Sequence, residues 1–338
     1  MGDIGQEPAL VRVLKAYMLP FAIATGTLVF FAFESIPALE PWRDPLGSLI
    51  GSLMPLMIFL MLFFAFLKIR PQELLLMPWH WWLILAEFGS AVLLCVYLYA
   101  AEGLSAESVA LWHAMLACLV SPTAAAVAVL VGKLGGSGSR STSYILLSNV
   151  ATAICVPLLF PLARHSLEFN FLEEFLQIMS MTIPMLIVPL VTALALKYFA
   201  PDFSARLSAR SRDLSFWIWV FTLTSVAGTA VAKIYHAPFG TQVVCEISLV
   251  ALLATALHFA LGKLLGHPYH YRVTAGQCLG QKNMVFGIYI TTAYLSEAAV
   301  IGAGWYLLWQ NLVNAWQMAY KVRLDRRAAE RGEAPYQE

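Results

Sequence analysis

Apolar runs of about twenty residues recur from one end of this chain to the other, and they constrain the fold more than any other feature. A helix of that length crosses the hydrocarbon layer of a bilayer and satisfies its own backbone hydrogen bonds there. Apolar residues make up 60% of the 338 residues and charged residues 12%. The sequence therefore predicts an all-α polytopic protein embedded in the lipid bilayer, and it excludes nucleic acid as a partner.

Ten segments, each bounded by polar or Pro/Gly-rich residues, are predicted to be transmembrane helices. In the first half of the chain they are 14–34, 46–67, 78–100, 108–132 and 141–162, and in the second half 172–199, 214–234, 243–266, 273–296 and 302–321. Because five spans precede the second half, that half must run in the opposite direction through the membrane. We therefore expect ten transmembrane helices in two inverted five-helix repeats.

The distribution of Lys and Arg supports this count. With both termini on the cytoplasmic side, 17 of the 21 Lys and Arg residues lie in cytoplasmic segments. Arg43, Arg164 and Lys233 lie outside, and Lys282 lies within a predicted span. Cytoplasmic loops carry such an excess of positive charge. We expect a multi-pass protein of the plasma (inner) membrane with both termini cytoplasmic, and a solvated cytoplasmic tail over residues 322–338.

Two of the predicted spans carry helix breakers near their middle. The motif Ser121-Pro122-Thr123 interrupts 108–132, where the proline removes a backbone donor. Gly276 and Gly280 lie at a similar depth in 273–296. Each is the fourth span of its half, and unwound backbone at matching places is typical of transporters, where it binds substrate or ions. Kinked helices occur in other membrane proteins too, but the matching positions favour transport.

A lysine and a glutamate are predicted to meet at the centre of the membrane. Lys282 lies ten residues after Arg272, which at 1.5 Å per residue is a depth of roughly 15 Å. Glu87 lies nine residues after Pro78, at roughly 13.5 Å on a span that runs in the same direction. An unpaired charge at that depth costs at least about 2.5 to 3.5 kcal/mol. We expect Lys282 and Glu87 to form an ion pair, either as a structural link between two helices or as part of an ion or proton site.

Several amide side chains lie at the same depth as this pair. One or two can be explained as hydrogen bonds between helices, but the set favours a polar binding site. The set is Gln277, Gln281, Asn283, Asn149, Gln310, Asn311 and Asn314, with the hydroxyl of Thr152.

Enzymes and metal proteins leave no comparable pattern in this sequence. His113 and His258 have no paired spacing for a metal or a haem, so no metal site is expected. No nucleophile with a neighbouring base and no cluster of acids is present, so the chain is not predicted to be an enzyme. A channel, a receptor or a membrane redox protein remains the alternative from a different functional class.

These residues together resemble the bile acid:sodium symporter family of secondary transporters, over nearly the whole chain. The resemblance is carried by "MPLMIFLMLFFAFLKI", "LVSPTAAAVAVLVGKLGG", "VPLLFPL", "GQKN" and "WQN", in that order. It implies one transmembrane transporter domain over residues 1–338, with a panel of spans 1, 2, 6 and 7 beside a core of spans 3–5 and 8–10. The interrupted spans 4 and 9 cross in that core. A small organic anion binds between panel and core.

The resemblance also implies roles for individual residues. Substrate-binding groups are expected at Asn283, Asn311, Gln310 and Thr123. Ion or proton coupling is expected at Lys282, Glu87, Gln281, Gln277 and Asn149. The sodium-ligand positions of the family are degraded, because they fall on Val127, Ala128, Ala153 and a position near Cys278. Glu87 and Lys282 take the places of two glutamine ligands.

The sequence thus predicts a secondary active transporter of a small organic anion, similar to the sodium symporters. The alternative is a sodium-independent or proton-coupled transporter in which the Lys282–Glu87 pair replaces sodium. No cofactor is expected apart from sodium itself.

Overall fold

The computed structural model describes the backbone of residues 9–69, 72, 74–164 and 170–338. Side chains are described from residue 21 onward within these ranges, apart from 164, 212, 213 and 215. Five of the basic residues behind the predicted charge asymmetry therefore lie outside the described side chains: Arg12, Lys15, Arg70, Arg164 and Arg212.

The described chain is helical, and its one pair of extended segments is an isolated bridge between Thr123 and Lys282. The helices are α1 (Ala9–Ser35), α2 (Glu40–Phe66), α3 (Pro78–Ala100), α4 (Ala106–Val120), α5 (Val127–Lys133), α6 (Gly138–Arg164), α7 (Phe171–Leu186), α8 (Val188–Phe199), α9 (Pro201–Arg210), α10 (Arg212–Tyr235), α11 (Thr241–Gly266), α12 (Arg272–Gly280), α13 (Met284–Tyr294) and α14 (Glu297–Glu330).

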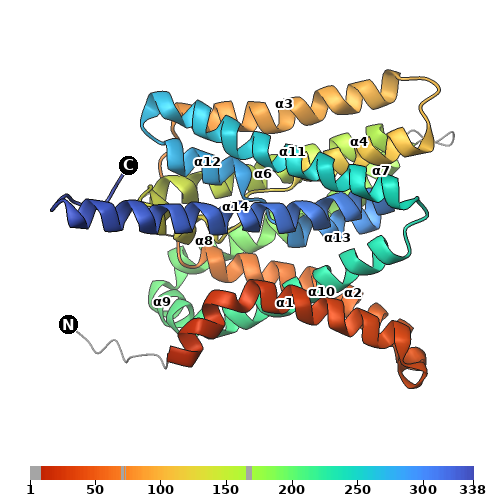
Figure 1. The fold of residues 1–338 in the computed structure, drawn as a ribbon, viewed down its shortest axis with the longest axis horizontal. Helices are drawn as coiled ribbons and strands as arrows, with labels where there is room; N and C mark the ends of the chain where they lie inside the picture. Colours follow the sequence, from red (N-terminus) through yellow and green to blue (C-terminus); the bar gives the residue numbers. More distant parts are fainter. Residues whose placement is uncertain (1–8, 70–71, 73, 165–169) are drawn as a thin grey trace.

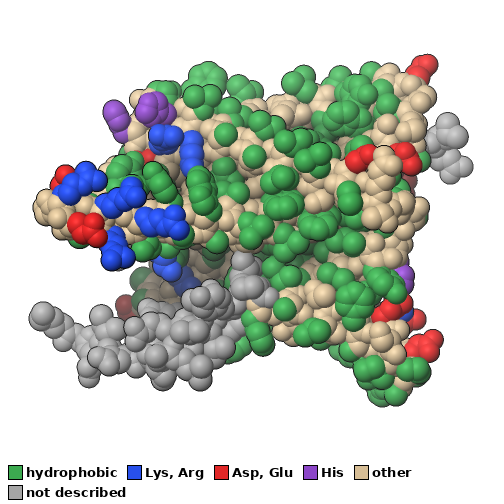
Figure 2. All heavy atoms as spheres, in the orientation of Figure 1, with side chains coloured by type: hydrophobic (Ala, Val, Ile, Leu, Met, Phe, Trp, Pro, Cys, Tyr) green, Lys and Arg blue, Asp and Glu red, His purple; other side chains and the backbone are tan. Residues whose placement is uncertain are grey.

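Six of these helical segments are long and apolar enough to cross a membrane: Pro37–Phe66, Pro78–Ala100, Gly138–Ala163, Phe171–Phe199, Phe216–Tyr235 and Thr241–Tyr269. Large apolar side chains on them face outward, as Leu93 and Leu257 do, and hydrophobic side chains cover the flank of the molecule in Figure 2. A soluble protein rarely exposes an apolar surface of this extent. The chain is therefore a membrane-embedded helical protein.

The helices form two groups that lie side by side. In one group α1 packs against α10, and α2 packs against α8 and α10. In the other, α11 packs against α12, α14 and α4, while α3 packs against α6 and α4 (Figure 1). The α10 helix also contacts α14 and α13, which joins the groups.

The interruption predicted at Ser121-Pro122-Thr123 is present. The α4 helix ends at Val120, and Ser121 is already extended, with φ −69° and ψ 134°. A proline disfavours helical backbone in the residue before it and cannot donate to the preceding turn. Helical structure resumes only at Val127.

The second interruption lies slightly later in the chain than the glycines alone indicate. The α12 helix runs through Gly276 to Gly280, and residues 281–283 form the break. The prediction of a breaker at Gly276 is wrong, because this glycine serves close packing. A Cβ at Gly276 would lie 2.6 Å from Cγ of Lys263 on α11, so α12 can approach α11 only without a side chain there.

The first half of the predicted tail is helical, and most side chains of residues 322–338 are exposed. The α14 helix continues without a break from Glu297 to Glu330, far past the predicted span end at residue 321. The last residues then fold back, so that the backbone N–H of Glu338 donates to the carbonyl of Gly135, 2.7 Å away. In Figure 2 Lys and Arg side chains gather at this end of the molecule.

Candidate functional site

The two interrupted helices meet through their unwound backbone. Thr123 and Lys282 form an antiparallel bridge. Beside it, the N–H of Ala124 donates to the carbonyl of Gln281 at 3.0 Å, and the N–H of Asn283 donates to the carbonyl of Pro122 at 2.6 Å. Each break leaves backbone N–H and C=O groups without the hydrogen bonds that a continuous helix would give them. Here the groups of one break form hydrogen bonds with those of the other.

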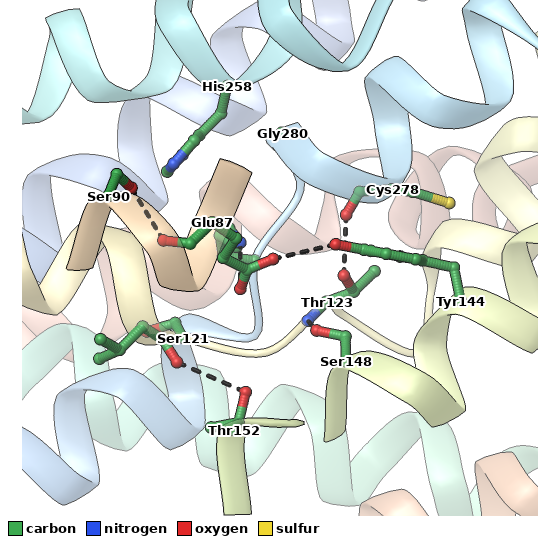
Figure 3. Close-up of polar contacts among 12 residues, drawn as sticks. Glu87, Ser90, Ser121, Thr123, Tyr144, Ser148, Thr152, His258, Cys278 and Gly280 are labelled. Atoms are coloured by element: carbon green, nitrogen blue, oxygen red, sulfur yellow. Dashed lines mark hydrogen bonds and ion pairs between the residues drawn. The ribbon is translucent and has the colours of Figure 1, made fainter. Parts of the chain in front are cut away.

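Side chains from three further helices complete this crossing. The hydroxyl of Thr123 donates to the carbonyl of Cys278 at 2.8 Å, and the N–H of Thr123 donates to the Ser148 hydroxyl on α6 at 3.0 Å. Figure 3 shows Thr123 between these two residues. The hydroxyl of Tyr306 on α14 donates to the carbonyl of Gly280 at 2.9 Å, and the His258 ring on α11 bonds the same hydroxyl at 2.8 Å.

Gln310 of α14 holds the backbone of Lys282 on both sides. Its side-chain oxygen accepts from the N–H of Lys282 at 2.8 Å, and its side-chain nitrogen donates to the carbonyl of Lys282 at 3.2 Å. The carbonyls at the crossing therefore accept hydrogen bonds from protein donors: those of Pro122, Cys278, Gly280, Gln281 and Lys282. Carbonyls released from a helix are the usual ligands of a transported cation, and here these oxygens are already engaged.

The predicted ion pair between Lys282 and Glu87 is confirmed. The Nζ atom of Lys282 lies 2.6 Å from Oε1 of Glu87, and both side chains are completely buried. The second carboxylate oxygen of Glu87 accepts from the hydroxyl of Tyr144 on α6 at 3.0 Å. Figure 3 shows Glu87 and Tyr144 pointing toward one another. Among the ion pairs of the described residues, this is the pair in which neither side chain reaches the surface.

This pair joins three parts of the fold. Glu87 comes from the continuous α3, Tyr144 from α6, and Lys282 from the break between α12 and α13. A buried charge that loses its partner costs about 3 to 5 kcal/mol. The charges therefore hold the break against α3 and α6, and any change in the protonation of either partner changes that contact.

The other residues expected to bind substrate occupy different environments. Asn283 is 4% exposed and caps α13, since its Oδ1 accepts from the N–H of Phe286 at 3.3 Å, while its Nδ2 has no partner among the described residues. Asn311 is half-buried and donates to the carbonyl of Leu307 in its own helix. Thr123 and Gln310 bind backbone at the crossing, as described above.

The remaining amides expected in coupling lie around the crossing with part of their hydrogen-bonding capacity unused. Gln277 donates to the side chain of Gln317 at 3.1 Å. Asn149 donates to the carbonyl of Ile145 one turn earlier. Among the described residues, the side-chain oxygens of Asn149, Gln277 and Gln281 are buried without a partner.

Tyr144, Tyr306 and Gln317 contribute to the site, and sequence reasoning missed their roles. Tyr144 and Tyr306 lie within apolar runs and resemble core aromatics, although a buried tyrosine hydroxyl usually has a partner. Gln317 lies seven residues after Gln310, on the same face of one helix. That spacing is the signal that could have identified it.

No protein-family model matches the sequence, and no curated protein matches it either.

Proposed function

We propose that this protein is a secondary active transporter of a small organic anion in which the Lys282–Glu87 pair takes the role of a coupling sodium ion. The proposal includes ten spans in two inverted repeats, both termini in the cytoplasm, and the panel and core arrangement of the bile acid:sodium symporters. The observation that carries it is the buried 2.6 Å ion pair at the crossing of two broken helices.

Transport is supported by the crossing itself. Broken helices that meet near the centre of a bundle are characteristic of secondary transporters, which bind their substrates at the half-helix ends. Here α13 begins at Met284 with Asn283 as its N-cap, directly after Lys282 in the chain. The positive end of a helix dipole thus follows the residue that carries the ammonium group, which favours an anion.

Independence from sodium is supported by the chemistry of the crossing. A sodium ion needs several oxygen ligands, and five carbonyls at the crossing already accept hydrogen bonds from protein groups: those of Pro122, Cys278, Gly280, Gln281 and Lys282. The Lys282 ammonium already supplies one positive charge at this place, balanced by Glu87. A further cation would add an uncompensated charge to a buried site.

Proton coupling follows from the pair by charge balance. A proton taken up by the Glu87 carboxylate neutralises it and leaves the Lys282 ammonium without its partner. That charge attracts the substrate anion. Loss of the proton restores the ion pair and releases the anion. One proton and one monoanion move together, so the cycle carries no net charge.

The experiment is uptake by the purified full chain in sodium-free liposomes that contain a pH-sensitive dye. A panel of carboxylates and sulfonates is added outside, with sulfonates included because they do not cross lipid as neutral acids. We expect at least one anion to acidify the lumen without sodium, at a rate that a membrane potential does not change. Uptake that requires sodium contradicts the proposal. The double variant Lys282→Gln with Glu87→Gln is the control, and it should move no protons.

A further inference from the structure

A row of polar side chains runs along one face of α14. Gln310, Asn314, Gln317 and Lys321 follow one another at intervals of four, three and four residues, which places them on a single side of the helix. Each is at least nine-tenths buried, with exposed fractions of 3%, 7%, 9% and 8%. Buried polar residues of this number on one helix face are expensive in a membrane protein unless they have partners.

The row connects the central site with one end of the molecule. At its inner end Gln310 holds the backbone of Lys282. At its outer end Lys321 pairs with Asp325, whose side chain is 34% exposed. Lys321 lies eleven residues after Gln310, which corresponds to roughly 16 Å of helix, about half the thickness of the hydrocarbon layer.

Several amide atoms along this row have no partner among the described residues. On α14 they are both side-chain polar atoms of Asn314 and the side-chain nitrogen of Gln317. The side-chain oxygens of Gln277 and Gln281 at the second break are also without a partner, and the Gln277 amide donates to Gln317 of the row. A buried polar atom left unsatisfied costs about 1 to 3 kcal/mol.

These unpartnered side-chain atoms include both hydrogen-bond donors and hydrogen-bond acceptors. An anion would need donors alone, and a cation would need acceptors alone. Exchanging the oxygen and nitrogen of an amide leaves the mixture unchanged, because each side chain carries one of each. Water donates and accepts, and bridges buried polar groups in this way.

We propose that the amide row holds a chain of internal water that links the Lys282–Glu87 pair to the end of the molecule where α14 ends, and that protons reach the pair along it. By the charge distribution this end is the predicted cytoplasmic face. The unpartnered amide atoms are the evidence for the water chain itself. Its use as a proton path rests on the proposed proton coupling.

The mouth of the row lies at Gly135 and Gly136, where the C-terminal residues cover it. The Cε atom of Lys321 and the backbone of Tyr336 lie against Gly135. The Glu338 carboxylate accepts from the N–H of Thr274 at 3.0 Å and from its hydroxyl at 2.6 Å. An acid is well placed there, because it meets the positive end of α12.

Titratable groups from five helices surround the central pair. Among the described residues, those that act on the pair electrostatically are thiols, phenols and one imidazole: Cys118 on α4, Tyr144 and Cys155 on α6, His258 on α11, Cys278 on α12 and Tyr306 on α14.

The water chain is tested by the reactivity of introduced thiols in the reconstituted full chain. Asn314→Cys and Gln317→Cys are made in a Cys155→Ser, Cys245→Ser background, which removes the two native cysteines that are not buried. The probe is a small, permanently charged methanethiosulfonate, which reacts with thiolates and therefore needs water at the sulfur. Trp316→Cys is the matched control, because Trp316 neighbours Gln317 but is 63% exposed on a different face of α14.

We expect both row thiols to react at least tenfold faster than the Trp316→Cys thiol, and only when the reagent is on the side where α14 ends. Rates equal to or below that of the control overturn the proposal, as does reaction from the opposite side alone. This measurement does not depend on transport, so it remains valid if the proposed function fails.

The proton path is tested by Asn314→Leu, which removes both unpartnered atoms of that side chain without breaking any protein hydrogen bond described for it. We expect proton-coupled uptake to slow at least tenfold, while the protein unfolds at the same or a higher temperature and binds the anion with unchanged affinity. If the introduced thiols react as expected but Asn314→Leu takes up the anion at an unchanged rate, the water chain is present and is not the proton path.

Discussion

Lys282 Nζ lies 2.6 Å from Oε1 of Glu87, and both side chains are completely buried. The lysine belongs to an unwound segment and the glutamate to a continuous helix. One short contact therefore links the break between α12 and α13 to the uninterrupted helix α3.

Removing only the lysine should be far more damaging than removing both charges. Lys282→Ala leaves Glu87 buried without a counter-charge, so we expect a loss of about 3 to 5 kcal/mol in the free energy of unfolding. Lys282→Gln with Glu87→Gln should lose much less, because no charge remains unpaired. Chemical unfolding of the detergent-solubilised protein measures both.

The exposed pair of Lys233 and Glu297 is the matched control for this prediction. Its atoms are 2.7 Å apart, but the side chains are 33% and 44% exposed. Lys233→Ala should therefore cost no more than about 1 kcal/mol. Equal losses from Lys233→Ala and Lys282→Ala would contradict the view that burial makes the central pair important.

The depth of the central pair follows from the sequence, but the partners of the amides do not. Every helical residue advances 1.5 Å, so counting from Pro78 and Arg272 places Glu87 and Lys282 at the same level. Which face of a helix a residue occupies relative to its neighbours depends on how each helix rotates about its own axis. Two features of the site depend on that rotation. One is the hydrogen bond between Gln277 and Gln317, and the other is the hydrogen bonding of Gln310 to the Lys282 backbone.

Of the two glycines predicted to interrupt the second span, only Gly280 lies at the break. Glycine lowers helix stability, and it also permits two helices to approach closely. Gly276 shows only the second effect, and nothing in its immediate sequence separates the two.

Tyr144 should stabilise the carboxylate of Glu87. Its hydroxyl donates to Oε2 at 3.0 Å inside a fully buried cluster. Tyr144→Phe keeps the ring and removes this donor, so we expect a loss of about 1.5 to 3 kcal/mol, the usual worth of a hydrogen bond to a charged group. Thermal and chemical unfolding provide the measurement.

Tyr320 offers the comparison for this substitution. Its side chain is 54% exposed on α14, so Tyr320→Phe should change the stability by less than about 0.5 kcal/mol. If Tyr144→Phe behaves like Tyr320→Phe, the hydroxyl contributes nothing to the ion pair.

The close contact of α11 and α12 should depend on Gly262. A Cβ at this position would lie 2.9 Å from the Cα of Gly276 and still closer to the Ala275 carbonyl, and backbone atoms cannot move aside as a flexible side chain does. We expect Gly262→Ala to destabilise the protein by about 1 to 3 kcal/mol. Gly51→Ala, where no atom lies within 4 Å of the added Cβ, should be neutral or stabilising. Similar unfolding curves for the two variants would refute the close packing.

Asn283 carries one atom that caps a helix and one that we propose binds substrate, and two substitutions separate them. Its Oδ1 caps α13 and its Nδ2 is unpartnered among the described residues. Asn283→Ala loses both, so uptake should be abolished at a cost of about 0.5 to 2 kcal/mol in stability, which leaves the fold intact. Asn283→Ser keeps an oxygen that caps a helix N-terminus about as well as asparagine does, but it lacks the amide nitrogen. We therefore expect Asn283→Ser to unfold like the unmodified protein and yet to transport no anion. Normal uptake by either variant would place the substrate elsewhere in the molecule.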